Sequence, residues 1–107
     1  MSEANEKKIL ANLGLCARAR KLIFGVPMIC EAMRKGGASA PLMVFEASDT
    51  AENTHKKISD KCQYYQVRQI RLSCGGAELA AAMGKTSFLA AVAVTDPQLC
   101  KLMESSI

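Results

Sequence analysis

Apolar and polar residues follow one another along this chain with the periods of helices and of short strands. Near the start, apolar side chains recur every three or four residues, which predicts the buried face of a first helix: Ile9, Leu10, Leu13, Cys16 and Ala17. The apolar triplet Leu22–Phe24 predicts a short strand. A second helix is predicted from Pro27, which a first helical turn tolerates, to the pair Gly36 and Gly37. Residues 41–45 then predict a strand buried on both faces.

A capping-box pattern predicts the third helix. Asp49 and Glu52 have the three-residue spacing at which a cap side chain and a glutamate satisfy each other's backbone N–H groups. From there the helix is expected to run to about Tyr65, with Glu52 and Lys56 paired one turn apart on its outer side. Residues 67–72 follow with an imperfect alternation that predicts a third, more exposed strand.

Glycine and proline mark the elements in the rest of the chain. Residues 77–83 predict a short helix, and Gly84 is placed to end it. Residues 88–94 are almost unbroken in apolar character, which predicts a central strand. Asp96 supplies an N-cap and a first-turn proline follows it, so the last helix is predicted over Pro97–Glu104. This alternation predicts an α/β fold in which helices cover both faces of a sheet, a three-layer α/β/α sandwich.

The length and charge of the chain limit what it can be. At 107 residues it is expected to form one domain, spanning residues 1–107, with a real hydrophobic core. Half of the residues are apolar and 22% are charged, as in compact cytosolic proteins. No apolar run is long enough to span a bilayer and the first residues are too polar for a signal peptide, so we expect a cytoplasmic protein without membrane contact. The net charge of +4 favours a polyanionic partner, though only mildly.

Five cysteines are spread through the chain without the spacing of a disulfide framework or a zinc site: Cys16, Cys30, Cys62, Cys74 and Cys100. The single histidine, His55, has no second pair of ligands to complete a metal site. We therefore expect five free thiols, most of them small core residues, and no metal.

The sequence lacks the common motifs of catalysis. It contains no nucleophile elbow, no Walker loop, no dinucleotide-binding glycine pattern and no zinc-protease helix. Gly84, Lys85 and Thr86 resemble the end of a phosphate loop, but the alanines before them make a helix C-cap the better interpretation. We predict a binding protein that is not an enzyme and needs no cofactor.

The joint at Gly25 is the first candidate site. Glycine lets the chain turn sharply from strand into helix, and the first N–H groups of a helix carry a partial positive charge that suits phosphate or base acceptors. Arg18, Arg20 and Lys21 stand just before the joint and are candidates for phosphate contact. Cations at the end of a helix also offset its dipole, so this simpler role stays open.

Five stretches of the sequence carry a resemblance to a known family: A-R-A-R-K-L-I-F-G at residues 17–25, A-S-D-T-A-E-N-T-H-K-K at 47–57, D-K-C-Q-Y-Y-Q-V at 60–67, E-L-A-A-A-M-G-K at 78–85 and V-A-V-T-D at 92–96. On these stretches and the order of its elements, nearly the whole chain resembles a bacterial YlxQ-type member of the kink-turn RNA-binding ribosomal protein superfamily. The resemblance implies a mixed four-stranded sheet between helices and a structured RNA as partner.

The resemblance also implies an RNA-binding edge built from two segments. The first opens the second helix, where the family has Gly-Thr-Asn-Glu or a variant and this chain has Gly25, Val26, Pro27 and Met28. The second is the loop before the last strand, which offers a phosphate contact and a stacking surface through Lys85, Thr86, Ser87 and Phe88. For Phe88 we favour a different role, a buried anchor of the last strand.

Three positions depart from the family pattern. Pro27 has no backbone N–H to donate, and Met28 has no group that hydrogen-bonds well to a guanine edge. Glu31 stands where the family carries a basic residue, and it is expected to repel phosphates. We therefore expect poor discrimination between a standard kink-turn and a straight duplex.

Two functions remain in play. The first is a non-catalytic RNA-binding protein of the translation apparatus, ribosomal or not, and the charge and the resemblance favour it. The alternative is a protein–protein interaction module that kept the fold and lost specific RNA readout, with an exposed apolar edge at Val26, Met28 and Phe88. A solvated face, not a site, is expected for three lysines of the third helix: Lys56, Lys57 and Lys61.

Overall fold

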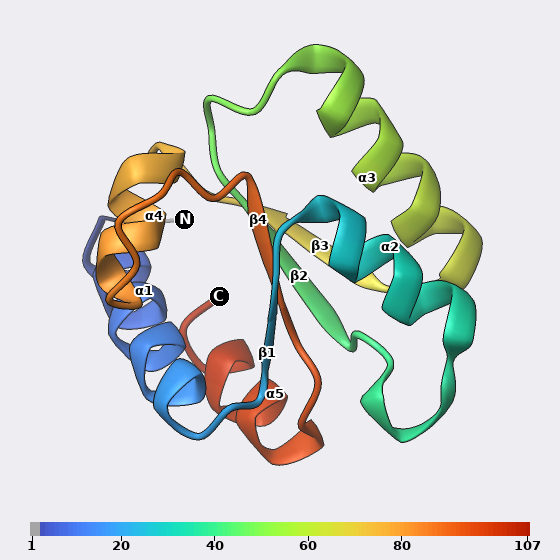
Figure 1. The fold of residues 1–107 in the computed structure, drawn as a ribbon. Coiled ribbons are helices and arrows are strands. Elements are labelled where there is room, and N and C mark those ends of the chain that lie inside the picture. Colours follow the sequence, from blue (N-terminus) through green and yellow to red (C-terminus); the bar gives the residue numbers. More distant parts are fainter. Residues whose placement is uncertain (1–2) are drawn as a thin grey trace.

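Helices cover both faces of one four-stranded sheet in the computed structural model, which describes residues 3–107 (Figure 1). The first part of the chain forms α1 (Glu3–Arg18), β1 (Leu22–Phe24), α2 (Val26–Lys35), the short 3-10 helix η1 (Gly37–Ser39) and β2 (Met43–Glu46). The second part forms α3 (Glu52–Tyr65), β3 (Arg68–Arg71), α4 (Gly76–Ala82), β4 (Ala91–Val94) and α5 (Pro97–Glu104).

β4 lies in the middle of the sheet, as its apolar sequence predicts. The strand order is β1-β4-β2-β3. β4 pairs antiparallel with both β1 and β2, so Val92 has Phe24 on one side and Phe45 on the other. β2 pairs parallel with β3, which makes the sheet mixed and confirms the arrangement that the resemblance implied. In β3, an edge strand, only Ile70 is buried, in agreement with the predicted exposed strand.

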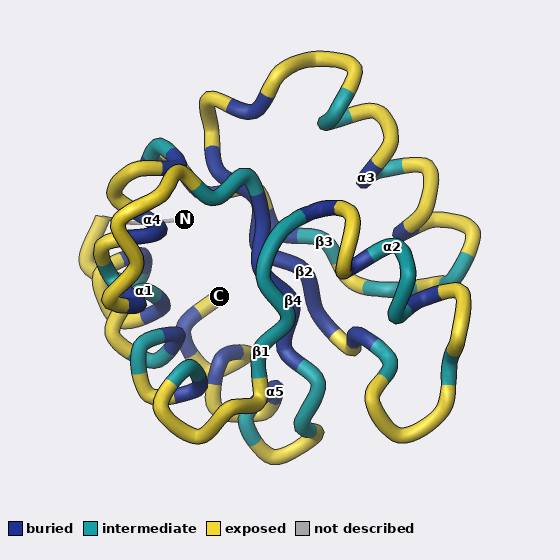
Figure 2. Tube along the Cα trace, in the orientation of Figure 1, coloured by how far each residue is buried: buried dark blue, intermediate teal, exposed yellow. Residues whose placement is uncertain are grey.

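The core is divided between the two faces of the sheet. α1, α4 and α5 lie against one face, and α2 and α3 lie against the other (Figure 1). Leu13 and Phe45 belong to the first apolar layer, whereas Ile29, Val44 and Ile58 belong to the second. Successive strand residues point to opposite faces, so the neighbours Val44 and Phe45 serve different layers. β2 and β4 accordingly run through the buried centre of the molecule (Figure 2), and the layers of helices on both sides confirm the three-layer α/β/α sandwich.

Two strands, β2 and β4, begin later than the apolar sequence predicted. β2 begins at Met43, because Leu42 before it is exposed. β4 begins at Ala91, and Phe88 lies outside it with 54% of its surface exposed, so the expectation that Phe88 anchors the core is wrong. Its ring lies instead against Gly76, where an added Cβ would be 2.3 Å from Phe88 Cε2.

Asp49 does not cap the helix that follows it. Ala51 is the N-cap of α3, without a side-chain hydrogen bond, and no ion pair joins Glu52 to Lys56 within residues 3–107, so both local expectations are wrong. The Asp49 Oδ1 atom accepts instead a hydrogen bond of 2.9 Å from the N–H of Gly76, the first residue of α4. The carboxylate therefore stabilises a helix 27 residues away in the sequence.

Two other helix ends form as predicted. Gly84 follows α4 with φ +73°, and the N–H groups of Lys85 and Gly84 donate to the carbonyls of Ala80 and Ala81 at 2.9 and 3.1 Å. These two bonds close the end of α4 in a Schellman motif. At the start of α5, the Asp96 side chain accepts hydrogen bonds from two backbone N–H groups, as its sequence position predicts.

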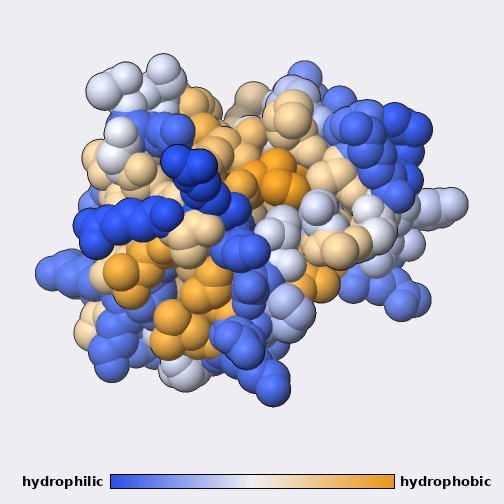
Figure 3. Space-filling model, turned by 60° about the horizontal axis from the view of Figure 1, so that its bottom comes forward, coloured by the Kyte–Doolittle hydropathy of each residue, from blue (hydrophilic) through white to orange (hydrophobic). Residues whose placement is uncertain are grey.

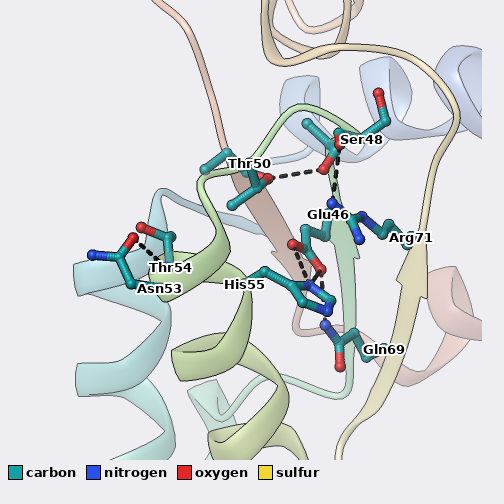
Figure 4. Close-up of polar contacts among 10 residues, drawn as sticks. Glu46, Ser48, Thr50, Asn53, Thr54, His55, Gln69 and Arg71 are labelled. Atoms are coloured by element: carbon teal, nitrogen blue, oxygen red, sulfur yellow. Dashed lines mark hydrogen bonds and ion pairs between the residues drawn. The ribbon is translucent and has the colours of Figure 1, made fainter.

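A buried carboxylate holds α3 to the sheet. Glu46, the last residue of β2, has no exposed surface, and its carboxylate accepts hydrogen bonds from Gln69 Nε2 at 2.8 Å and His55 Nδ1 at 2.7 Å (Figure 4). Four residues further along the chain, the Thr50 hydroxyl donates a hydrogen bond to the Ala47 carbonyl at 2.8 Å. The bonds from His55 and Gln69 supply the partners that the buried Glu46 carboxylate requires.

A second carboxylate joins α1 to the segment after β3. Glu6 accepts hydrogen bonds from the Ser73 and Cys74 backbone N–H groups at 2.8 and 2.9 Å, and a further one from the Ser73 hydroxyl. Burial by itself works to raise the pKa of Glu6, but these hydrogen bonds outweigh it and hold the pKa below its ordinary value. The ionised form of Glu6 is thus the one that the fold stabilises.

Within the described residues, no three His, Cys, Asp or Glu side chains gather where they could hold a metal ion. No helix of residues 3–107 has the length and apolar character needed to cross a bilayer. The five cysteines carry free thiols, four of them buried and Cys30 half-buried.

Candidate functional site

The turn between β1 and α2 is held by glycine geometry. Gly25 has φ +86°, and its N–H donates to the Ala91 carbonyl of β4 at 3.0 Å, which fixes the turn to the centre of the sheet. No side chain caps the first turn of α2, and Pro27 lies within that turn. The N–H groups of Val26 and Met28 therefore have no partner within the helix, and they give this end of α2 a partial positive charge.

A hollow of about 370 Å³ lies beside β1, and we name it the arginine hollow; its lining combines cations with apolar side chains, from Ala17, Arg18, Arg20, Leu22, Phe24, Met83 and Lys85. Arg18 ends α1, and Arg20 takes a left-handed conformation with φ 60° that turns the chain into β1. Lys85 comes from the loop after α4, and its Nζ lies 4.6 Å from the centre of the Phe24 ring. The three cations thus meet from two segments far apart in the sequence.

A second hollow of about 360 Å³ lies at the start of α2, and we name it the Gly25 hollow; it is lined by Gly25, Val26, Pro27, Thr54, Lys57, Phe88, Leu89 and Ala90. The loop between α4 and β4 contributes Phe88, whose position against Gly76 leaves the other side of its ring exposed. α3 contributes Thr54 and Lys57. A cation, a half-exposed aromatic ring and an open helix N-terminus therefore surround one concave surface.

The two hollows share no lining residue, but the same two segments of the chain contribute to both. Phe24 lines the first and Gly25, the next residue, lines the second, while the loop from α4 to β4 supplies Lys85 to one and Phe88 to the other. In Figure 1 the part of this loop that enters β4 and the turn from β1 into α2 lie at the upper end of the sheet, whereas α1 ends and β1 begins at its lower end. We call the two hollows together the Gly25 edge.

The face where α1 ends and β1 begins is mixed in character. Figure 3 brings forward this lower end of the molecule and shows hydrophilic side chains interleaved with apolar ones. The exposed cations Arg18 and Arg20 and the half-buried Leu22 belong to this region. Charged and apolar groups thus alternate here, and no uninterrupted apolar surface covers this view.

The predicted apolar edge is only partly present. Val26 is buried, with 7% of its surface exposed, because it packs into the layer between α2, α3 and the sheet, so its expected place in an exposed patch is wrong. Met28 and Phe88 are exposed, by 61% and 54%. Four predicted site residues are exposed but line neither hollow: Lys21, Met28, Thr86 and Ser87.

Glu31 is less of an obstacle to anions than its charge suggested. Its carboxylate forms ion pairs with Arg34 at 2.5 Å and Lys35 at 3.9 Å, both on α2. The hydrogen bond from Arg34 holds the pKa of Glu31 below its ordinary value. Two neighbouring cations therefore offset the negative charge that we expected to repel phosphates.

Four residues of the Gly25 hollow were not predicted as site residues: Thr54, Lys57, Leu89 and Ala90. Thr54 and Lys57 lie three residues apart, so they share one side of α3, and Lys57 had been assigned to a solvated face. Their only sequence signal is their position within the stretch 47–57 on which the family resemblance rests. The packing of Ile58 and Cys62 of α3 against Ile29 and Met33 of α2 brings them beside Gly25.

Known proteins share both sequence and fold with this chain. Residues 7–104 match the model of the ribosomal protein L7Ae/L30e/S12e/Gadd45 family. The chain is 42% identical over 67 residues to the RNA-binding protein YlxQ of Enterococcus faecium, a match that covers 63% of this chain and 62% of that protein. It is 38% identical over 84 residues to the RNA-binding protein YlxQ of Bacillus subtilis, over 78% of this chain and 79% of that protein.

Solved structures agree with these matches. A protein of unknown function from Bacillus halodurans is 30% identical, superposes with a TM-score of 0.81, and is matched over 92% of this chain and 95% of its own. The Giardia lamblia 15.5kD RNA binding protein superposes with a TM-score of 0.80 over 99% of this chain and 87% of its own, and at 13% identity this likeness shows the fold alone. With residues 7–104 matched by the family model, this chain belongs to the ribosomal protein L7Ae/L30e/S12e/Gadd45 family, as a YlxQ-type member.

Proposed function

We propose that this chain is a cytoplasmic, non-catalytic RNA-binding protein of the translation apparatus, and that it holds structured RNA at the Gly25 edge. Both YlxQ relatives are named as RNA-binding proteins, and neither name denotes an enzyme. The observation that carries the proposal is the meeting of Arg18, Arg20 and Lys85 around one hollow, whose lining reaches Phe24, the residue before the Gly25 turn that opens α2.

The arginine hollow suits the phosphate backbone. Within residues 3–107, none of Arg18, Arg20 and Lys85 takes part in an ion pair, so their charges are available to an outside anion. Guanidinium groups bind phosphate oxygens through two parallel hydrogen bonds, and each phosphate contact releases condensed counterions. The hollow therefore supplies affinity that depends on salt and not on base sequence.

The Gly25 hollow suits a base. Phe88 offers an exposed aromatic ring for stacking, and Lys57 is the cation of the same lining. The free N–H groups of Val26 and Met28 are donors for acceptor atoms on a base edge or a phosphate. Thr54 adds a hydroxyl to the same surface.

Kink-turn selectivity is expected to be weak in this chain. Pro27 donates no hydrogen bond and the exposed Met28 side chain reads no purine edge. Each missing base contact corresponds to about 1–3 kcal/mol of discrimination. The unmodified chain should therefore bind a kink-turn and a straight duplex of equal length alike, whereas P27N/M28E/E31K should regain a preference for the kink-turn.

A salt titration tests the proposal. Binding of a fluorescent RNA hairpin is measured by anisotropy at several salt concentrations, with the wild type, with R18Q/R20Q/K85Q, and with K7Q/K8Q/K101Q, which loses the same charge elsewhere. The slope of log affinity against log salt should fall by roughly 0.7–0.9 for each lost phosphate contact in the first variant alone. An unchanged slope would place the RNA surface elsewhere, and an absence of hairpin binding by the wild type would refute the function.

The alternative, a protein–protein module, receives less support from the geometry. Of its three proposed apolar residues, Val26 is buried and only Met28 and Phe88 are exposed. Large exposed apolar patches mark protein interfaces, and of these two residues only Phe88 lines the Gly25 hollow, where Lys57 also lies.

A further inference from the structure

The outer side of α3 carries a second basic surface, away from the arginine hollow. A hollow of about 690 Å³ runs along this helix, and we name it the α3 stripe; it is lined by Asn53, Lys56, Lys57, Asp60, Lys61, Tyr64 and Tyr65. Each of these residues has another of the set three or four positions away, so they follow one side of the helix over about three turns.

The lysines of the α3 stripe are not neutralised by the fold. Within residues 3–107, Lys56, Lys57 and Lys61 are exposed and form no ion pair, and Asp60 is the one acidic residue of the lining. Three positive charges along about one and a half turns, against one negative charge, leave a field that attracts a linear polyanion.

An aromatic pair stands at the far end of the stripe. The rings of Tyr64 and Tyr65 meet edge to face, with 4.8 Å between centroids and 80° between planes. Tyr64 is nevertheless 78% exposed, the highest exposure among the large apolar and aromatic side chains of the described chain. The contact with Tyr65 restrains the Tyr64 ring while most of its surface stays open, which is the condition for a stacking platform.

The stripe is continuous with the Gly25 edge. Lys57 lines both the α3 stripe and the Gly25 hollow, so its ammonium group stands between the two concave surfaces. A strand of nucleic acid that leaves the Gly25 hollow past Lys57 meets Lys61 one turn later and Tyr64 after that. Cations followed by an exposed ring, in one line, match the alternation of phosphates and bases in a single strand.

We propose that the α3 stripe binds a single-stranded RNA segment that continues from the structured RNA held at the Gly25 edge, with the lysines on its phosphates and Tyr64 stacked on a base. This proposal rests on the proposed function and deepens it, because it assigns a second contact surface and the form of RNA that it takes. The lysines of α3, which the sequence assigned to a solvated face, thereby gain a role.

The test compares two RNAs that differ only in a tail. One is a fluorescent hairpin, and the other is the same hairpin with a single-stranded uridine extension of about eight nucleotides, prepared separately at its 5′ and at its 3′ end. At one salt concentration, the extension at one of the two ends should raise the affinity of the wild type about tenfold.

Variants of the stripe should lose this gain and keep hairpin affinity. Y64A and K56Q/K61Q should bind both RNAs equally, whereas Y64F, which keeps the ring, and K8Q/K101Q, which loses the same charge on other helices, should retain the gain. Lys57 is left unchanged because it also lines the Gly25 hollow. All substituted side chains are exposed, and circular dichroism melts check that each variant is folded.

Each outcome decides between the proposals. Hairpin binding without any gain from either extension, or a gain that survives in Y64A and K56Q/K61Q, overturns the inference and leaves the proposed function standing. Failure of the wild type to bind any of these RNAs overturns both. The stripe variants are also compared with the wild type by crosslinking in cells. If they bind all RNAs as the wild type does but lose a crosslink to a protein that the wild type forms, the stripe is a protein interface instead.

Discussion

The ammonium group of Lys85 lies 4.6 Å from the centre of the Phe24 ring, so the loop after α4 is joined to the last residue of β1. A cation–π contact at an exposed site is worth about 0.5–1 kcal/mol, enough to orient Lys85 without burying its charge. The contact places Lys85 beside the two arginines of the arginine hollow. The contact between Lys85 and Phe24 links the two segments of the chain that the sequence predicted to bind RNA.

Lys85 and Lys21 should therefore differ in their effect on RNA binding. K85Q removes a cation that lines the arginine hollow, whereas K21Q removes an exposed cation that lines neither hollow. We expect K85Q to lower the salt slope of hairpin binding by roughly 0.7–0.9, and K21Q to change it little. Anisotropy titrations of both variants at several salt concentrations measure the slopes. Equal effects of K85Q and K21Q on the salt slope would show that a position in the arginine hollow does not decide which cations contact RNA.

Gly76 should not tolerate alanine. An added Cβ would lie 2.3 Å from the Phe88 ring, so G76A must displace the ring or the start of α4, at a cost of about 1–3 kcal/mol. Urea unfolding of G76A, F88A and the double variant gives a thermodynamic cycle. The cost of G76A should shrink when Phe88 is already alanine, because the clash is then absent. An equal cost in both backgrounds would mean that Phe88 does not press on Gly76.

Replacement of His55 should destabilise the fold more than replacement of its exposed neighbour Lys56. In H55L the buried Glu46 carboxylate loses one of its two side-chain donors and keeps Gln69 alone. A charge-assisted hydrogen bond lost at a fully buried acceptor costs about 1–3 kcal/mol of unfolding free energy. K56A, on the solvent side of the same helix, is the control. Urea denaturation of H55L and K56A would contradict this prediction if the two midpoints coincided.

Acid should weaken the protein through Glu6. Its pKa is held below the ordinary value of 4.5 in the folded chain, so its contribution to stability is fully present above that value. The contribution is lost as the pH falls through the lower, folded pKa, when the carboxylate becomes protonated. E6Q should be less stable than the wild type near neutral pH and should lose less stability on acidification. Thermal unfolding from pH 7 down to about 3 would show parallel curves if Glu6 played no part.

The five thiols should differ in reactivity. Burial raises the pKa of Cys62, Cys74 and Cys100 to about 11 and raises that of Cys16 as well, so few thiolates form at these sites in the folded protein. Cys30 is half-buried and should react first. Intact-mass analysis after brief alkylation at pH 8 should show one modified thiol in the native protein. All five should react in denaturant without reductant, and a resistant pair would reveal a disulfide.

Sequence reasoning worked best where a feature depends on its neighbours in the chain. The end of α4 at Gly84 and the cap of α5 at Asp96 were predicted because their hydrogen bonds close within six residues. Asp49 has an equally good local pattern, yet its carboxylate binds Gly76, a partner that only the tertiary fold brings close. The start of β4 was missed because an apolar residue such as Phe88 serves equally well in a strand and in a surface loop.

The candidate site shows the same limit. Arg18 and Arg20 were identified from their place before the Gly25 turn, and Lys85 from the family resemblance, but their meeting in one hollow depends on the pairing of β1 with β4. Lys57 was assigned to solvent because nothing local indicates that α3 packs beside α2. Periodicity tells which side of a helix is polar, and it does not tell what that polar side faces.

The position of β4 also bears on how the chain folds as it is made. β1 pairs with β4 alone, and β4 is the last strand of the described chain, although it lies between β1 and β2. At synthesis rates of about 5–20 residues per second, Phe24 waits roughly 3 to 13 seconds before Ala91 is joined to the chain. During that time the parallel pair β2 and β3 is the one strand pairing of this sheet that can form. The sheet is thus completed by insertion of β4, and the Gly25 edge, whose turn is fixed by Ala91, is assembled only after β4 has been synthesised.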